Sequence, residues 1–260
     1  MVRDEPDRAG GGESAASEWS GLCRIGGVAA WTLMIYSLAT MVQLVVAGGQ
    51  PATAAEAFSL LQHNKILGLM RLDLPTVLAM PLYYLVFLGL LAALRRADPV
   101  YAIVSTALGF AGVTLLLATP TALSMISLSE KYAAATTESA RGQFLAAGEA
   151  ILASDIWHGT GAMLGGMLLQ CGAVLISVVM LRTNVFGKAI AYVGIVTHGL
   201  DLAHIVLGPF VPAAGFALMA IGGPLYLVWF PLVGRRLLQL GRGGASPPER
   251  YVSVSGPTSG

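Results

Sequence analysis

Six long apolar stretches constrain this chain more than any other feature of its sequence. Each can cross the hydrocarbon core of a bilayer as an α-helix, which takes roughly 20 residues. The stretches run from Ile25 to Ala47, Leu74 to Leu94, Val100 to Ala118, Ile156 to Leu181, Ala189 to Gly208 and Ala213 to Val233. The sequence therefore predicts an all-α fold, a polytopic transmembrane helical bundle with six spans.

The scarcity of charge supports a lipid environment. Charged residues make up 11% of the 260 residues and hydrophobic residues 55%, whereas a typical soluble domain is about 25% charged. The formal net charge of +1 provides no basic surface for nucleic acid. The expected partner is the lipid bilayer, and nucleic acid is not expected.

The two ends of the chain differ in composition from the apolar region. Residues 1–22 mix Gly, Ser, Ala and charged residues, and residues 241–260 are rich in Gly, Ser and Pro. Such segments bury little apolar surface, so we predict a disordered cytoplasmic arm and tail around a six-helix transmembrane domain at residues 23–240. A second interpretation stays open for the first span, because Ala52-Thr53-Ala54 resembles a signal-peptide cleavage site.

Basic residues predict the orientation. With six spans, one side of the membrane holds eleven Lys and Arg residues and the other side four. The first set is Arg3, Arg8, Arg24, Arg95, Arg96, Arg182, Lys188, Arg235, Arg236, Arg242 and Arg250, and the second is Lys65, Arg71, Lys131 and Arg141. Because cytoplasmic loops are enriched in Lys and Arg, we expect both termini in the cytoplasm.

Two longer loops lie on the predicted outer side. Residues 58–72 mix apolar and polar residues, and we expect them to lie in the membrane interface or to extend the second span. Residues 137–154 have apolar side chains at helical spacing after Thr137, which is typical of a helix with a capping residue. We expect a short amphipathic helix lying on the bundle rather than a substrate lid.

Small residues and prolines indicate how the spans pack. Gly161 and Gly165 form a GxxxG motif, which lets membrane helices approach closely. We expect this face to contact a second copy of the chain or another membrane protein. Four prolines, Pro75, Pro81, Pro224 and Pro231, predict bends in the second and sixth spans.

The fifth span carries His198, Asp201 and His204 in an otherwise apolar sequence. At about 100° per residue, these side chains fall within an arc of about 120°. An ionised side chain within the bilayer is costly unless it is paired. We therefore predict that this stripe faces the bundle and that Asp201 has a partner, with His198 and His204 as the nearest candidates.

The topology places further polar residues at a similar depth. The fourth span begins with Asp155, Trp157 and His158, and the second span follows Arg71 and Asp73. If these helices are neighbours, their polar residues line one pocket in the outer half of the membrane. The candidate residues for a ligand or proton pathway are Asp201, His198, His204, His158, Asp155, Asp73 and Arg71.

Several roles are compatible with this cluster. The plainest is a structural network, with Asp201 between two histidines and Arg71 bonded to Asp73. A proton or polar-ligand pathway would use Asp201 as the titrating group. A zinc site would use His158, His198, His204 and Asp201 and could activate water to hydrolyse a lipid. Ligation of a haem by two histidines is a further alternative.

No common catalytic or cofactor motif accompanies the cluster. The sequence contains no HExxH, GxSxG, P-loop or CxxCH motif. Cys23 and Cys171 are too far apart for a CxxC site. We predict no cofactor, with zinc and haem as the weaker alternatives, and the sequence favours a non-enzymatic protein.

Two segments carry a resemblance to a known family. They are RIGGVAAWTLMIYSLAT in the first span and the region from Arg182 to Gly241, which ends in LVGRRLLQLG. These segments resemble a bacterial family of multi-spanning membrane proteins of unknown function (domain of unknown function 4386). The resemblance implies a six-helix protein of the bacterial cytoplasmic membrane and supplies no catalytic residues.

The sequence thus favours a non-enzymatic membrane protein, either a transporter-like unit or a sensor or accessory protein. One alternative is a metal-dependent membrane hydrolase that uses the same His/Asp cluster. The other is a structural subunit of a membrane complex.

Overall fold

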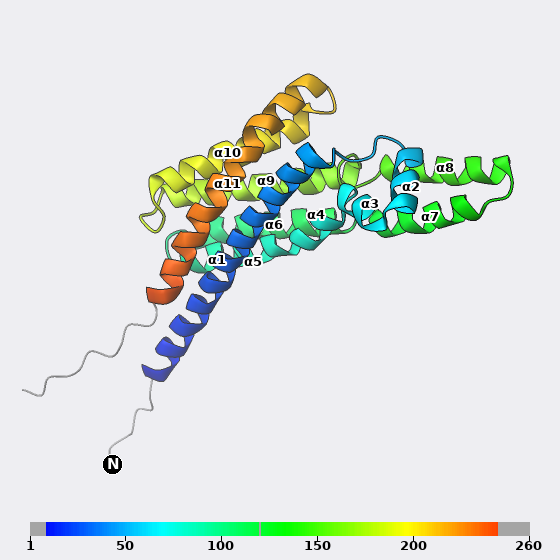
Figure 1. Ribbon diagram of the computed structural model, residues 1–260. Helices are drawn as coiled ribbons and strands as arrows, with labels where there is room; N and C mark the ends of the chain where they lie inside the picture. The colour runs from blue at the N-terminus through cyan, green and yellow to red at the C-terminus, as the bar shows by residue number, and fades with distance from the viewer. Residues whose placement is uncertain (1–8, 120, 244–260) are drawn as a thin grey trace, which may run out of the picture.

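The computed structural model describes residues 9–119 and 121–243. These residues form helices and no strand (Figure 1). The helices are α1 (Ala9–Val46), α2 (Ala54–His63), α3 (Lys65–Arg71), α4 (Leu74–Ala79), α5 (Pro81–Leu94), α6 (Pro99–Leu117), α7 (Ala122–Ala134), α8 (Glu138–Leu152), α9 (Thr160–Leu181), α10 (Lys188–Leu207) and α11 (Pro212–Gly243).

Six helical stretches are long and apolar enough to cross a membrane. They are Trp19–Val46, Leu74–Leu94, Pro99–Ala134, Thr160–Leu181, Lys188–Leu207 and Pro212–Arg242. The predicted all-α bundle with six spans is confirmed. Helix α1 begins at Ala9 and α11 ends at Gly243, so both helices extend beyond residues 23–240, and the domain limits stay a prediction. A helix that is held by tertiary packing can continue past its apolar segment, and the remainder of both predicted tails lies outside the described residues.

The six spans close into a ring. Helix α1 contacts α5 and α11, α5 contacts α6, α6 contacts α9, and α10 contacts both α9 and α11. Figure 1 shows both ends of the described chain at the same end of the bundle as the α5–α6 and α9–α10 connections. We call this the terminal end and the opposite end the distal end. Helices α1, α6 and α10 run toward the distal end, and α5, α9 and α11 run back.

Glycines allow the spans to approach one another closely. A Cβ atom on Gly26 of α1 would lie 2.9 Å from the Cα atom of Gly89 in α5, and one on Gly27 would lie 3.0 Å from the Gly234 carbonyl oxygen in α11. Both contacts lie in the terminal half of α1. Backbone contact of this kind can hold helices together in lipid, where the hydrophobic effect between them is absent.

The GxxxG motif of the fourth span has a role different from the predicted one. A Cβ atom on Gly165 would lie 2.9 Å from the carbonyl oxygen of Gly112 in α6. Gly165 is buried, and Gly161 is half-buried beside Thr119. The predicted partner face at Gly165 is therefore an intrachain contact, since α6 already covers it.

The bend predicted in the second span is a break between two helices, α4 and α5. Pro81 begins α5 directly after the short helix α4, and Pro75 lies in the first turn of α4. A proline has no backbone N–H and disrupts the preceding turn, which accounts for the division of this span. Pro224 and Pro231 lie within the continuous helix α11.

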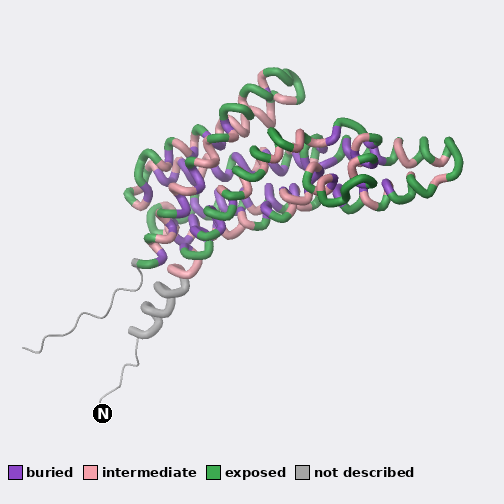
Figure 2. Tube along the Cα trace, viewed as in Figure 1, coloured by how far each residue is buried: buried purple, intermediate pink, exposed green. Residues whose placement is uncertain are grey.

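A second, smaller core lies at the distal end (Figure 2). It is built by α2, α3, α7 and α8 around buried Phe58, Leu61, Met125 and Leu152. Thr137 caps α8, as predicted, by accepting the Ala140 N–H at 3.2 Å. The expected position of α8 on the transmembrane bundle is wrong, because its apolar side packs on α7 and α2. Likewise, residues 58–72 form two helices of this distal core instead of extending the second span.

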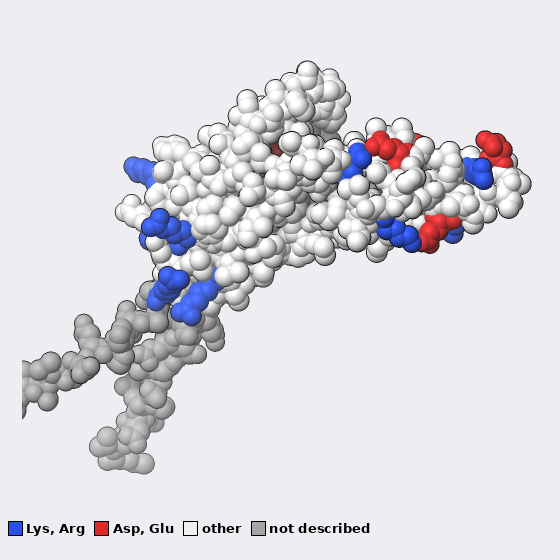
Figure 3. All heavy atoms as spheres, viewed as in Figure 1, with Lys and Arg blue, Asp and Glu red and all other residues white. Residues whose placement is uncertain are grey.

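Charge is distributed unevenly along the bundle. Figure 3 shows Lys and Arg at the terminal end, a broad uncharged belt, and a mixture of both charges at the distal end. The distal charges pair with one another in part, as in the 2.6 Å contact between Lys65 and Glu130. The uncharged belt corresponds to the surface that six spans would present to lipid.

Candidate functional site

Four polar side chains meet in the middle of the bundle, and we call them the central cluster: Gln170 of α9, His198 and Asp201 of α10, and Tyr226 of α11. The Gln170 Nε2 atom donates to Asp201 Oδ2 at 2.5 Å. The Tyr226 hydroxyl donates to the same oxygen at 2.9 Å. These bonds tie three neighbouring spans together.

The amide of Gln170 also fixes the orientation of His198. Its Oε1 atom lies 2.6 Å from His198 Nδ1, and because a carbonyl oxygen only accepts, Nδ1 must carry the proton. The Tyr226 hydroxyl oxygen, whose single proton is directed to Asp201, also lies 3.3 Å from this Oε1 atom and 3.4 Å from His198 Nδ1. His198 Nε2 and Trp229 Nε1 are buried and have no hydrogen-bond partner within the described part of the chain. The two rings lie edge to face, with centroids 4.4 Å apart.

The polar stripe of the fifth span faces the bundle, as predicted. His198 is 1% exposed, whereas Tyr192 and Val196 on the other side of α10 are 58% and 50% exposed. The hydrogen bonds of Asp201 come from Gln170 and Tyr226 and not from the predicted histidines. Of the two histidines, His204 interacts with Asp201 electrostatically. Both donors come from facing helices, and the spacing along α10 cannot identify side chains of other spans.

A cavity of about 860 Å³ lies above the central cluster, in the distal half of the ring. Its polar floor includes Gln170, Asp201 and Tyr226, and its walls come from α1, α4, α5, α6, α9, α10 and α11. Most wall residues are apolar or aromatic, among them Met80, Met163 and Phe216. Trp157 and His158, in the connection between α8 and α9, line its distal side and are largely exposed.

One oxygen of Asp201 is free for a ligand. Asp201 lines the cavity, and both of its hydrogen bonds fall on Oδ2. Oδ1 accepts no hydrogen bond from the residues that the structure describes. Asp201 therefore lines a largely apolar chamber and keeps one carboxylate oxygen without a hydrogen bond from the described residues.

The two remaining histidines also reach the cavity. His204 lines it one turn above Asp201, and its Nδ1 donates to the Gly215 carbonyl at 2.8 Å. His158 lines the opposite side, with Nδ1 2.9 Å from Asp155 Oδ1. The predicted pocket thus brings together Asp201, His204 and His158, whereas His198, Asp155, Asp73 and Arg71 are not among the described residues that line it.

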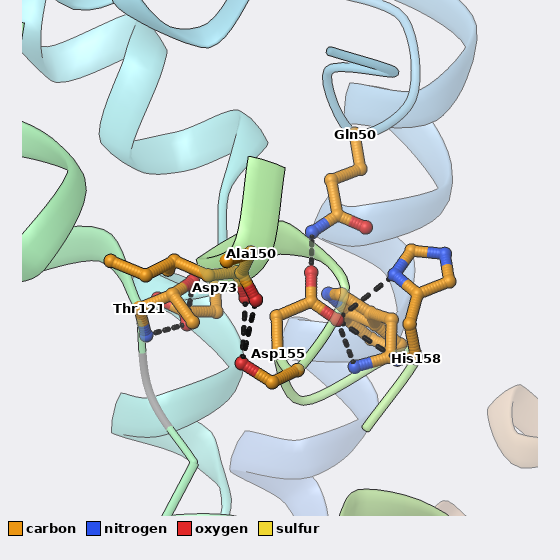
Figure 4. Close-up of polar contacts among 9 residues, drawn as sticks. Gln50, Asp73, Thr121, Ala150, Asp155 and His158 are labelled. Atoms are coloured by element: carbon orange, nitrogen blue, oxygen red, sulfur yellow. Dashed lines mark hydrogen bonds and ion pairs between the residues drawn. The ribbon is translucent and has the colours of Figure 1, made fainter. Parts of the chain in front are cut away.

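The carboxylates of Asp73 and Asp155 accept hydrogen bonds from backbone N–H groups (Figure 4). Asp73 is fully buried and accepts hydrogen bonds from the Thr121 backbone and hydroxyl and from the Ala122 N–H, which caps α7. Asp155 is also buried and accepts from the Trp157 and His158 N–H groups at 2.8 and 2.9 Å, and from the Gln50 amide. Carboxylates often satisfy free N–H groups in this way.

The predicted pair between Arg71 and Asp73 is wrong. Arg71 Nη2 lies 2.9 Å from Glu56 Oε1, and its Nε donates to the Gly49 carbonyl at 2.8 Å. The two side chains separate because Asp73 is directed inward to the start of α7, whereas Arg71 joins α3 to α2 and to the connection after α1. Arg71 therefore supports the distal core.

The candidate metal ligands are dispersed over the cavity. Within residues 9–119 and 121–243, no group of three or more His, Cys, Asp or Glu side chains could hold a metal ion. His158, His198 and His204 each use Nδ1 for a different partner. The geometry consequently provides no support for the zinc-dependent hydrolase.

Sequence reasoning missed Gln170 and Tyr226. A glutamine within the fourth span is itself an uncommon polar residue in hydrocarbon, where side-chain amides bond to neighbouring helices. That signal could have identified Gln170. Tyr226 resembles any interfacial tyrosine in the sequence, and only the packing of α11 brings its hydroxyl to Asp201.

Comparisons of the chain with known protein families, with curated proteins and with solved structures find no match. The resemblance to the bacterial multi-spanning family therefore stays a prediction.

Proposed function

We propose that this chain is a non-enzymatic protein of the bacterial cytoplasmic membrane that binds a small organic molecule in its distal cavity, as part of transport or sensing. The observation that carries the proposal is the 860 Å³ cavity with Gln170, Asp201 and Tyr226 of the central cluster at its floor. Ligand sites in proteins are commonly concave and apolar, with a few polar groups that fix the ligand's orientation.

The proposed orientation places the terminal end in the cytoplasm. Eight described cations lie at that end: Arg24, Arg95, Arg96, Arg182, Lys188, Arg235, Arg236 and Arg242. Four lie toward the distal end, where Glu side chains accompany them. The positive-inside rule then directs the cavity to the outer half of the membrane.

The walls indicate how a ligand would enter. Helix α1 touches α5 and α11 closely at Gly26 and Gly27, in its terminal half. Farther along, Tyr36 and Ser37 of α1 line the cavity, as do Phe216 and Met219 of α11. An apolar molecule that is dissolved in the outer leaflet could therefore reach the floor between these helices.

Ser37→Trp is expected to abolish photolabelling of the cavity. The experiment uses the full chain in nanodiscs and the neutral, apolar carbene precursor adamantyl diazirine. Mass spectrometry measures the label on the α9 peptide that contains Met163. Because Ser37 lines the cavity, the indole should fill that space and reduce labelling of this peptide severalfold.

Ala39→Trp is the matched control, since Ala39 is exposed and lies outside the cavity lining. This variant should keep the wild-type labelling. Equal labelling of the α9 peptide in both variants, or none in the wild type, would refute a ligand-accessible cavity.

A further inference from the structure

We propose that the ligand is a lipophilic cation, an amine, ammonium or phosphonium with apolar substituents, and that Asp201 is its counter-ion. This inference rests on the proposed function, because it assigns a ligand class to the same cavity.

The charges of the lining favour a cation. Asp201 is the single acidic residue among the described residues that line the cavity, and the same set contains no Lys or Arg. Of the two histidines in the lining, His158 contacts the Asp155 carboxylate, and His204 is bonded to the Gly215 carbonyl and interacts electrostatically with Asp201. A neutral imidazole leaves the charge of Asp201 in place. A carboxylate in a medium of low dielectric attracts a cation strongly and repels an anion.

The Oδ1 oxygen of Asp201 gives a cation a defined position at which to bind. Gln170 and Tyr226 hold Asp201 through Oδ2, so the carboxylate is already oriented when a ligand arrives. Binding then needs little reordering of the site, which favours affinity. A primary or tertiary ammonium could donate directly to Oδ1, and a quaternary cation would approach it through electrostatic attraction alone.

Aromatic rings complete the environment of a cation. Tyr36, Tyr83, Trp157, Phe216 and Tyr226 all line the cavity. The face of an aromatic ring attracts a cation within about 6 Å, more strongly when both are desolvated. The remaining lining, which includes Leu116, Met163 and Ile205, suits the apolar substituents. A hydrophilic cation has no apolar substituents to bury against this remaining lining.

Two ions of nearly the same shape and opposite charge test the proposal. Equilibrium dialysis measures the binding of radiolabelled tetraphenylphosphonium and of radiolabelled tetraphenylborate to the full-length protein in detergent. Binding to detergent is removed by subtracting the Ser37→Trp signal. The phosphonium should bind saturably and at least about tenfold more tightly than the borate, because one charge reverses sign beside a partly buried carboxylate.

Asp201→Asn should weaken phosphonium binding at least about tenfold, since it removes the charge and retains the side-chain shape. Glu130→Gln, which neutralises an exposed distal carboxylate, should leave binding within about twofold of wild type. The comparison of the two ions does not use Asp201→Asn, so the test survives misfolding of that variant.

The outcomes separate the two proposals. If the diazirine labels the cavity but the phosphonium and the borate bind equally, or Asp201→Asn binds the phosphonium as wild type does, the cation assignment is wrong and the cavity proposal stands. If the cavity takes up neither the diazirine nor either ion, both proposals fail.

Discussion

Gly112→Leu is expected to prevent assembly of the bundle and to leave less than about a tenth of the wild-type yield of monodisperse protein in detergent. A Cβ atom at Gly112 would lie 2.4 Å from the Leu169 backbone nitrogen and 2.5 Å from the Gly165 carbonyl oxygen. Both neighbours are backbone atoms of α9, so a rotamer change cannot relieve the clash. Overpacking alone costs about 1–3 kcal/mol, and separating two membrane helices adds the loss of their contacts.

Gly199→Leu provides the control for this substitution. A Cβ atom at Gly199 would have no neighbour within 4 Å, although the residue lies in the membrane helix α10. Its yield and its elution volume on size-exclusion chromatography should match those of the wild type. Normal yields of folded Gly112→Leu would contradict the packing of α6 on α9.

Gln170→Leu is expected to lower the apparent melting temperature by roughly 5–15 °C, the equivalent of about 2–4 kcal/mol. The substitution removes the nearer of two partners of His198 Nδ1, leaving the Tyr226 hydroxyl at 3.4 Å, and one of the two donors to Asp201. His198 is 1% exposed, so water cannot easily replace the lost acceptor. A buried polar group without a partner costs more than the hydrogen bond itself contributes. Thermal unfolding of the detergent-solubilised protein, followed by tryptophan fluorescence, measures the shift.

Gln62→Leu makes the same chemical change at an exposed position. Its amide donates a weaker bond of 3.3 Å to the Ser129 carbonyl, and its loss should change the melting temperature by no more than a few degrees. Equal shifts in Gln62→Leu and Gln170→Leu would show that the central cluster contributes nothing particular to stability.

The spans were predictable from sequence because hydropathy alone determines which segments can cross lipid. The second span is the clearest case, since the apolar stretch from Leu74 to Leu94 matches the helical stretch in the structure. The limits of the third span, which contains α6, were less predictable. Helix α7 continues the apolar stretch that contains α6 as far as Ala134, and its polar residues are accommodated by the distal core.

The site was predictable on one helix and not between helices. Helical periodicity is enough to place His198, Asp201 and His204 on one inward face. It cannot indicate which side chain of another span will reach them, and Gln170 and Tyr226 were missed for that reason. Asp73 and Asp155 were misread because a carboxylate at the start of a span can serve a ligand or free N–H groups, and only the tertiary structure brings the N–H groups of α7 to Asp73.

Cysteine accessibility tests most directly the central claim that the cavity opens to the outer side of the membrane. Ser37→Cys and Ala39→Cys are made in a chain that also carries Cys23→Ala and Cys171→Ala. A charged, membrane-impermeant methanethiosulfonate is then added to the outside of intact cells. The structure and the proposed orientation predict rapid modification at position 37, which lines the cavity, and little at position 39, which would face lipid. Resistance of position 37 to the external reagent, or its modification from the cytoplasmic side alone, would contradict the account.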